Sequence, residues 1–173
     1  MPLLRRMGGG GGPTGRRFMM REKLVSIGDD AWIEDEQGDR AYKVDGKALR
    51  IRDTFVLQDR AGNEVAKIQE RKLSVRDKMT IERGGRPLAT VHKALVGIRD
   101  RFAIDVEGGP DLRARGNFLD HEYHVERDGS TIATVSRKWF RVRETYGVEI
   151  APGEDEALLL AITVAIDSMT TRT

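Results

Sequence analysis

The chain has no cysteine, and of its 173 residues only 6% are aromatic and five are proline. The missing thiols exclude disulfides, thiolate nucleophiles and thiolate metal sites, and they fit a reducing compartment. Long apolar runs are also scarce, because the longest, residues 157–166 with Thr163 as its one interruption, is about half as long as a membrane-spanning helix. We therefore expect a cytoplasmic protein with no transmembrane segment.

A charge surplus of one sign is missing too. Lysine and arginine number 30 against 28 aspartates and glutamates, for a net charge of +2. The first 23 residues hold six basic side chains and one acid, so the rest of the chain is mildly acidic. A dedicated nucleic-acid binder carries a one-sided basic surface. We expect no nucleic-acid partner.

The N-terminal segment is rich in glycine, with an unbroken run at Gly8–Gly12. Such a segment cannot bury enough apolar surface to offset its conformational entropy. We expect residues 1–16 to be a disordered basic tail and residues 17–173 to form a single domain, which is long enough for one hydrophobic core.

A repeated pattern fills most of that domain. Each copy has two segments of alternating polar and apolar residues around a glycine-containing turn, which predicts a β-hairpin. The copies are 33–44, 57–68, 81–91, 125–135 and a weaker one at 104–115. Adding residues 18–24 and 145–150 gives about twelve strands, spaced as in an up-and-down barrel or a large curled sheet. Between hairpins an Arg-Asp or Arg-Glu pair recurs, which we interpret as a corner that joins one hairpin to the next; the pairs are Arg52-Asp53, Arg76-Asp77, Arg99-Asp100 and Arg143-Glu144.

The C-terminal segment has a different period. Pro152-Gly153 ends the last strand, and three acids at 154–156 place negative charge at a helix N-terminus. The apolar run that follows has no polar stripe, and a helix that is apolar all round must be buried all round. We therefore predict a mainly β fold: a twelve-stranded antiparallel barrel that encloses a central helix over 154–169.

Several segments together resemble the LURP-one-related family of the tubby C-terminal-like superfamily, which is related to the phospholipid scramblases. The matching segments are 21–33, 44–49, 116–123 and 139–143, together with the recurring Arg-Asp corners. The resemblance implies the same helix-in-barrel fold but no defined activity. It associates the tubby branch with phosphoinositide headgroups and the scramblase branch with membranes, calcium and lipidation. The absence of cysteine and of a long proline-rich N-terminus departs from the scramblase pattern.

Catalytic and metal sites are not indicated. The serines lie in no nucleophile-elbow context, and the clustered carboxylates lack EF-hand spacing. His121 and His124 would point to opposite faces of a strand, so they could not chelate one ion. We expect no catalytic residue, no metal and no cofactor, and therefore no enzyme.

The most suggestive segment is residues 137–143, which holds four cations and two aromatic rings. As a strand it would direct alternate side chains to one face and form an anion-binding surface. The candidate headgroup-binding residues are Arg137, Lys138, Trp139, Arg141 and Arg143. The alternative is a solvated strand face whose arginines pair with acids at neighbouring corners.

Two functional hypotheses follow. The first is a monomeric binding module that engages anionic phospholipid headgroups or a protein partner, and it predicts one contiguous positive patch. The second is a structural or scaffold domain with no small ligand, and it predicts cations interleaved with acids. Scramblase-like lipid translocation is a third and weaker hypothesis.

Overall fold

The computed structural model describes residues 15–22, 30–45, 54–70, 78–96 and 99–171. Within these ranges, twelve strands precede one helix, α2. Their bounds are β1 Arg16–Arg21, β2 Ala31–Asp35, β3 Arg40–Asp45, β4 Thr54–Asp59, β5 Glu64–Glu70, β6 Lys78–Arg83, β7 Arg86–Val96, β8 Arg99–Val106, β9 Leu112–Asn117, β10 Glu122–Arg127, β11 Ser130–Ser136, β12 Thr145–Ile150 and α2 Glu156–Thr171.

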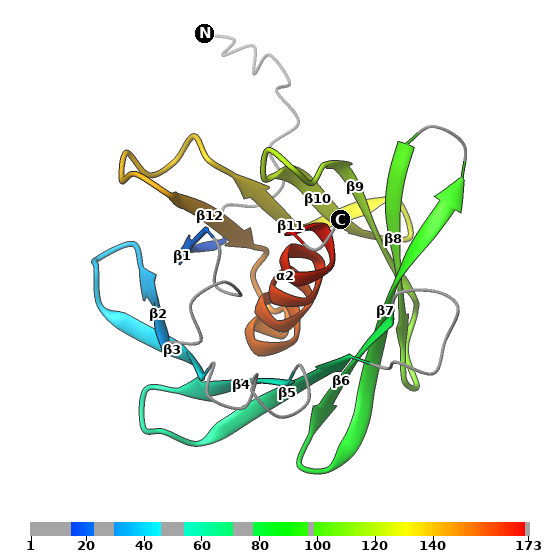
Figure 1. The fold of residues 1–173 in the computed structure, drawn as a ribbon, viewed down its shortest axis with the longest axis horizontal. Helices are drawn as coiled ribbons and strands as arrows, with labels where there is room; N and C mark the ends of the chain where they lie inside the picture. The colour runs from blue at the N-terminus through cyan, green and yellow to red at the C-terminus, as the bar shows by residue number, and fades with distance from the viewer. Residues whose placement is uncertain (1–14, 23–29, 46–53, 71–77, 97–98, 172–173) are drawn as a thin grey trace, which may run out of the picture.

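The strands form one closed antiparallel barrel in which neighbours in sequence are neighbours in space. The barrel closes where β1 pairs with β12, from Arg16 opposite Ile150 to Arg21 opposite Thr145. The strands surround α2, as Figure 1 shows. The predicted barrel of about twelve strands around a C-terminal helix is confirmed.

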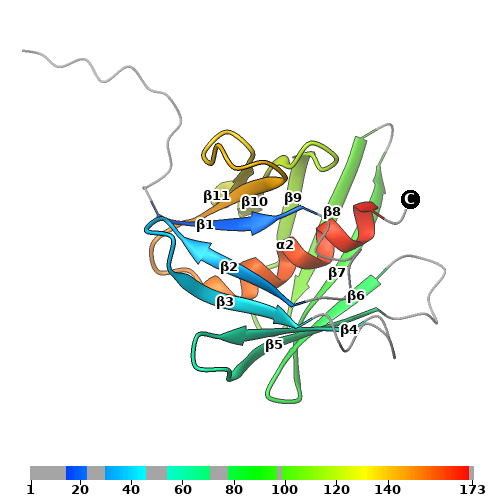
Figure 2. The ribbon, with the colours of Figure 1, turned by 60° about the vertical axis from the view of Figure 1, so that its left-hand side comes forward.

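All five predicted hairpins are present, at β2–β3, β4–β5, β6–β7, β8–β9 and β10–β11. Their turns contain glycines with positive φ, such as Gly38 at 84° and Gly62 at 89°, a conformation that other residues adopt only at a cost. Because the strands alternate in direction, these turns all lie at one end of the barrel, where α2 begins (Figure 2).

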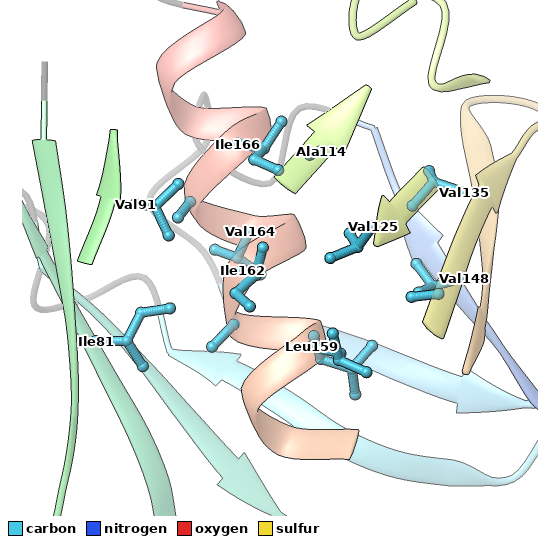
Figure 3. Close-up of a cluster of buried hydrophobic side chains, with 14 of the residues drawn as sticks. Ile81, Val91, Ala114, Val125, Val135, Val148, Leu159, Ile162, Val164 and Ile166 are labelled. Carbon is cyan, nitrogen blue, oxygen red and sulfur yellow. The ribbon is translucent and has the colours of Figure 1, made fainter. Parts of the chain in front are cut away.

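The core is the space between α2 and the inner faces of the strands. Every residue from Leu159 to Met169 is buried, as expected for a helix that is apolar on all sides. Figure 3 shows side chains of several strands, among them Ile81, Val125 and Val148, facing Ile162 and its neighbours on α2.

The end where α2 begins, which we call the clamped end, is held by arginines from three strands. Two make paired hydrogen bonds to acids just before the helix: Arg127 to Glu154 at 2.8 and 2.8 Å, and Arg83 to Asp155 at 2.8 and 2.9 Å. The third, Arg16, binds the Glu156 carboxylate at 2.9 and 3.1 Å, and Tyr42 donates its hydroxyl proton to the same group at 3.0 Å. The acids that favour the helix N-terminus thus also attach it to the barrel.

The helix begins two residues later than predicted. Asp155 is the N-cap, because its carboxylate accepts a hydrogen bond from the Leu158 N–H at 3.1 Å and its carbonyl accepts one from the Leu159 N–H. The helix therefore starts at Glu156.

The opposite end, where α2 finishes, is the loop end, and it carries the connections between hairpins. The Arg52-Asp53 and Arg76-Asp77 corners lie outside the described residues. Arg99-Asp100 opens β8, and Arg143-Glu144 lies in the turn before β12, with Glu144 at a φ of 58°. These two pairs do lie where one hairpin passes to the next.

Candidate functional site

The candidate headgroup-binding residues lie in a connection at the loop end and not in a strand. β11 ends at Ser136 and β12 begins at Thr145, so residues 137–144, here called the basic loop, follow no strand alternation. The prediction of a strand over 137–143 was wrong. The reason is that two consecutive rings, those of Trp139 and Phe140, pack on the same surface, whereas consecutive strand side chains point to opposite faces.

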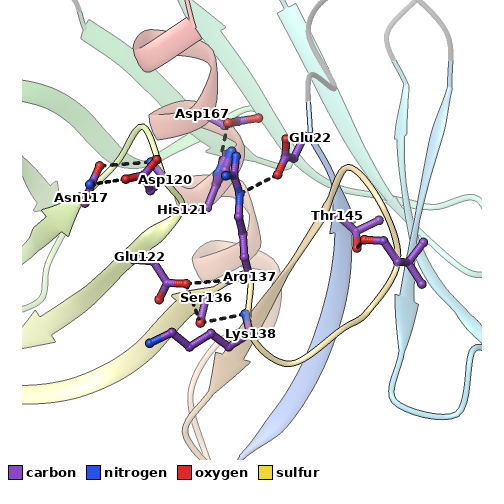
Figure 4. Close-up of polar contacts among 11 residues, drawn as sticks. Glu22, Asn117, Asp120, His121, Glu122, Ser136, Arg137, Lys138, Thr145 and Asp167 are labelled. Atoms are coloured by element: carbon purple, nitrogen blue, oxygen red, sulfur yellow. Dashed lines mark hydrogen bonds and ion pairs between the residues drawn. The ribbon is translucent and has the colours of Figure 1, made fainter.

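The first residues of the basic loop are fixed by Glu122, at the start of β10. Its carboxylate oxygen accepts hydrogen bonds from the Ser136 hydroxyl and from the Arg137 N–H, both at 3.0 Å. The Ser136 oxygen in turn accepts one from the Lys138 N–H at 3.1 Å. Figure 4 shows this small network joining two connections that are neighbours around the rim.

The Arg137 side chain points inward to Glu22, which follows β1. The two groups form an ion pair at 2.7 Å, and the Glu22 side chain is only 18% exposed. Glu22 also donates its N–H to the Glu144 carbonyl at 2.8 Å, so it contacts both ends of the basic loop. Arg137 therefore has a structural partner.

The two aromatic rings of the loop cover the outer face of β12 at Gly147. A Cβ at that position would lie 2.7 Å from a Trp139 ring atom and 2.9 Å from a Phe140 ring atom. The Arg17 guanidinium lies over the Trp139 ring, 4.8 Å from its centre, and also pairs with Glu149 at 2.6 Å. Trp139 therefore contributes to binding the loop to the barrel wall, and a cation already occupies one face of its ring.

The remaining cations of the loop point outward. Lys138, Arg141 and Arg143 are exposed, and none forms an ion pair with another residue that the structure describes. Val142 is 49% exposed, and its carbonyl accepts a hydrogen bond from the Thr145 hydroxyl at 2.7 Å. Of the five predicted residues, three are thus exposed and two take part in the protein's own packing.

Beneath the loop lies a buried polar cluster at the last turns of α2. The His121 ring stacks on the Tyr146 ring, with centres 4.1 Å apart and planes 9° from parallel. Its Nδ1 lies 3.7 Å from a carboxylate oxygen of Asp167, which is too long for a hydrogen bond. Both ionisable groups are buried, with side chains 10% and 5% exposed. Figure 4 shows His121 and Asp167 beside the Arg137–Glu22 pair.

Burial shifts the acid–base behaviour of this cluster. Loss of solvent, together with the negative charge of Glu22, raises the pKa of Asp167 to about 7. Loss of solvent lowers the pKa of His121, and the charge of Arg137 acts in the same direction. The pKa of Tyr146 is raised well above its ordinary value, mainly by burial. Each shift favours the neutral form.

Sequence reasoning missed this cluster. Its residues come from 22, 121, 146 and 167, so no local pattern brings them together. One signal was present: Asp167 is the first charged residue after the apolar run of α2, and a carboxylate that continues a buried face is an exception to the usual distribution of charge. The cluster is enclosed, because His121, Tyr146 and Asp167 are all buried.

The described residues contain neither a candidate metal centre nor a candidate membrane-spanning helix. Within the described ranges, no three histidine, aspartate or glutamate side chains are grouped so that they could hold a metal ion. No helix in the same part of the chain is both long enough and apolar enough to cross a membrane.

Comparisons with known proteins agree with this architecture. No curated protein was found to match the chain. Among solved structures, an X-ray structure of the Arabidopsis thaliana protein AT5G01750 superposes with a TM-score of 0.69 at 20% identity, covering 91% of this chain and 93% of that one, which shows a shared fold. The LURP-one-related family model matches residues 16–167, from the first strand almost to the end of α2. The chain therefore belongs to the LURP-one-related family.

Proposed function

We propose that the protein is a non-enzymatic, monomeric binding module of the cytoplasm that engages anionic phospholipid headgroups through Lys138, Arg141 and Arg143. The observation that carries this proposal is the exposure of three cations on a loop that is fixed to the barrel on both sides. Because the loop is already ordered, binding would cost little further conformational entropy.

The chemistry of the three side chains suits a phosphate group. Arginine guanidinium groups make paired hydrogen bonds to phosphate oxygens, and lysine adds a point charge. Near an anionic leaflet each cation contributes about 1 kcal/mol. Half-exposed Val142, between the two arginines, adds an apolar contact at the same tip.

The scaffold alternative also has an observation in its favour. Arg137 and Arg17 are paired with Glu22 and Glu149, which is the interleaving of cations and acids expected of a domain without a ligand. The proposal therefore excludes these two arginines from the binding residues.

Vesicle co-sedimentation of the full chain tests the proposal. Neutral vesicles are compared with vesicles that contain phosphatidylserine or a phosphoinositide, at low and at physiological salt. The test variant is Arg141→Glu/Arg143→Glu. A matched control, Arg60→Glu/Arg86→Glu, makes the same change in charge at exposed hairpin residues of the clamped end.

We expect salt-sensitive binding to the anionic vesicles, weakened at least tenfold in the test variant and little changed in the control. Equal losses in both variants would mean that only net charge matters. Absence of binding by the unmodified protein would favour the scaffold role and direct the search to protein partners.

A further inference from the structure

A row of basic side chains crosses the outer wall of the barrel, away from the basic loop. Strand register places Arg101 of β8 directly opposite Arg115 of β9, and Arg115 directly opposite His124 of β10. Side chains alternate along a strand, and the adjacent residues Phe102 and Ala114 are buried in the core. The three side chains of the row therefore project outward from three neighbouring strands.

A third arginine lies beside this row. Arg113 lies two residues before Arg115 and so on the same face of β9. Its cross-strand partner on β8 is Ala103, whose small side chain leaves the space above it open. Arg113, Arg115 and His124 are all exposed.

Acidic side chains offset only part of the positive charge of these arginines. The three members of the row face one another without an intervening acid. The Glu126 carboxylate is opposite Arg113 and forms an ion pair with Arg115 at 3.7 Å, a separation too long for a hydrogen bond. Asp105 lies one row further toward the clamped end, 3.8 Å from His92.

Like charges placed directly opposite each other in a sheet destabilise it. The Arg101–Arg115 pair is such an arrangement, and Arg113 adds a third positive charge beside it. An anion bound between these side chains would remove the repulsion and receive hydrogen bonds from several guanidinium groups.

We infer that Arg101, Arg113, Arg115 and His124 form a second anion site, on the wall of β8–β10, that takes a phosphate dianion. Guanidinium groups from two strands would make paired hydrogen bonds to its oxygens, and the His124 ring would close the third side. The wall site shares no residue with the basic loop, so it does not depend on the function proposed for that loop. The phosphate can belong to a soluble molecule or to a lipid headgroup such as phosphatidic acid.

Nuclear magnetic resonance titration of the full chain with inorganic pyrophosphate tests the wall site. We expect saturable shifts of the backbone amides around Arg101, Arg115 and His124. These shifts should weaken at least tenfold in Arg113→Ser/Arg115→Ser and persist in Lys138→Ser/Arg141→Ser/Arg143→Ser. Absence of shifts at the wall in the unmodified protein, or equal binding by the wall variant, would overturn the inference while leaving the loop proposal standing.

A vesicle measurement identifies the source of the phosphate. If co-sedimentation with phosphatidic acid vesicles also falls in the wall variant, the site takes a lipid headgroup. If only pyrophosphate binding falls, the ligand is a soluble phosphate compound. Both results support the wall site.

A stability measurement separates a binding site from a merely structural patch. Arg115→Thr removes the like-charge pair and introduces a residue that suits strands. We expect its melting temperature to exceed that of the unmodified protein without ligand, and we expect pyrophosphate to reduce this difference. A lower melting temperature for the variant, combined with no effect of pyrophosphate on the unmodified protein, would contradict the inference.

Discussion

The two ends of the barrel use ionisable side chains in opposite ways. At the clamped end each acid beside the start of α2 binds an arginine of a different strand, at distances of 2.8 to 3.1 Å. At the loop end Asp167 and His121 are buried 3.7 Å apart without a mutual hydrogen bond. One end is attached by ion pairs, whereas the other, beside the Arg137–Glu22 pair, also buries ionisable groups in an environment that favours their neutral forms.

The difference predicts which ionisable side chains can be substituted with little change in stability and which cannot. The arginines of the clamped end are partly exposed, so the solvent screens their ion pairs and the loss of one pair is a small perturbation. A buried ionisable group carries a larger desolvation cost, and that cost depends on pH. The basic loop and its exposed cations lie over the second environment, at the loop end.

The most severe way to break the comparison is to place a charge in the buried first turn of α2. Leu159→Asp would bury an unpaired carboxylate where the side chain is 2% exposed, at a cost of several kcal/mol, comparable to the stability of a whole domain. We expect no cooperative unfolding transition by circular dichroism. Leu119→Asp is the matched control, because Leu119 is 71% exposed. A cooperatively folded Leu159→Asp protein would contradict the threaded-helix architecture.

A sharper test of the loop end is Asp167→Asn. Folding raises the pKa of Asp167 from 3.8 to about 7. The favourable contribution of Asp167 to the free energy of unfolding is therefore fully present below pH 3.8 and is lost as the pH rises toward 7. Relative to the unmodified protein, the variant should therefore gain stability between pH 4 and 8, by roughly 2–4 kcal/mol.

Urea unfolding at several pH values measures this gain, with Asp128→Asn in an exposed turn as the control. The lowered pKa of His121 has the opposite effect on the pH dependence of stability. The contribution of His121 to the free energy of unfolding is present above pH 6.5 and is lost as the pH falls below that value. The difference between variant and unmodified protein isolates Asp167, and a difference independent of pH would refute the shift.

The smallest expected effect compares one ion pair from each end. Double-mutant cycles with Arg127→Met/Glu154→Gln and with Arg137→Met/Glu22→Gln measure the two coupling energies. We expect about 0.5–1.5 kcal/mol for each, with the larger value at the clamped end because Arg127 makes two hydrogen bonds. A larger coupling for Arg137 would show that the loop end is the more strongly attached.

The parts of the fold that sequence predicted are those encoded locally. The glycine turns with alternating flanks gave all five hairpins, and the uniformly apolar run after Pro152 gave the buried helix. Both inferences use side-chain spacing within a few residues, which strand and helix geometry convert directly into structure.

The parts that sequence could not predict depend on residues far apart in the chain. Arg16 and Glu156 are separated by 140 positions, and Glu22 and Arg137 are nearly as distant. The course of the basic loop also depends on Gly147. Because glycine has no side chain, the rings of Trp139 and Phe140 can pack directly on the backbone at this position. Composition identified the cationic segment, but only tertiary packing decides which of its cations remain exposed.

The position of α2 at the end of the chain has a consequence for biosynthesis. All twelve strands leave the ribosome before the segment that fills their interior, and the pairing of β1 with β12 cannot form until residue 150 has been made. The nascent chain therefore carries apolar inner faces with nothing to cover them until α2 has been made. Such a chain depends on late, long-range closure and is exposed to aggregation for longer than a protein whose core forms from its first residues.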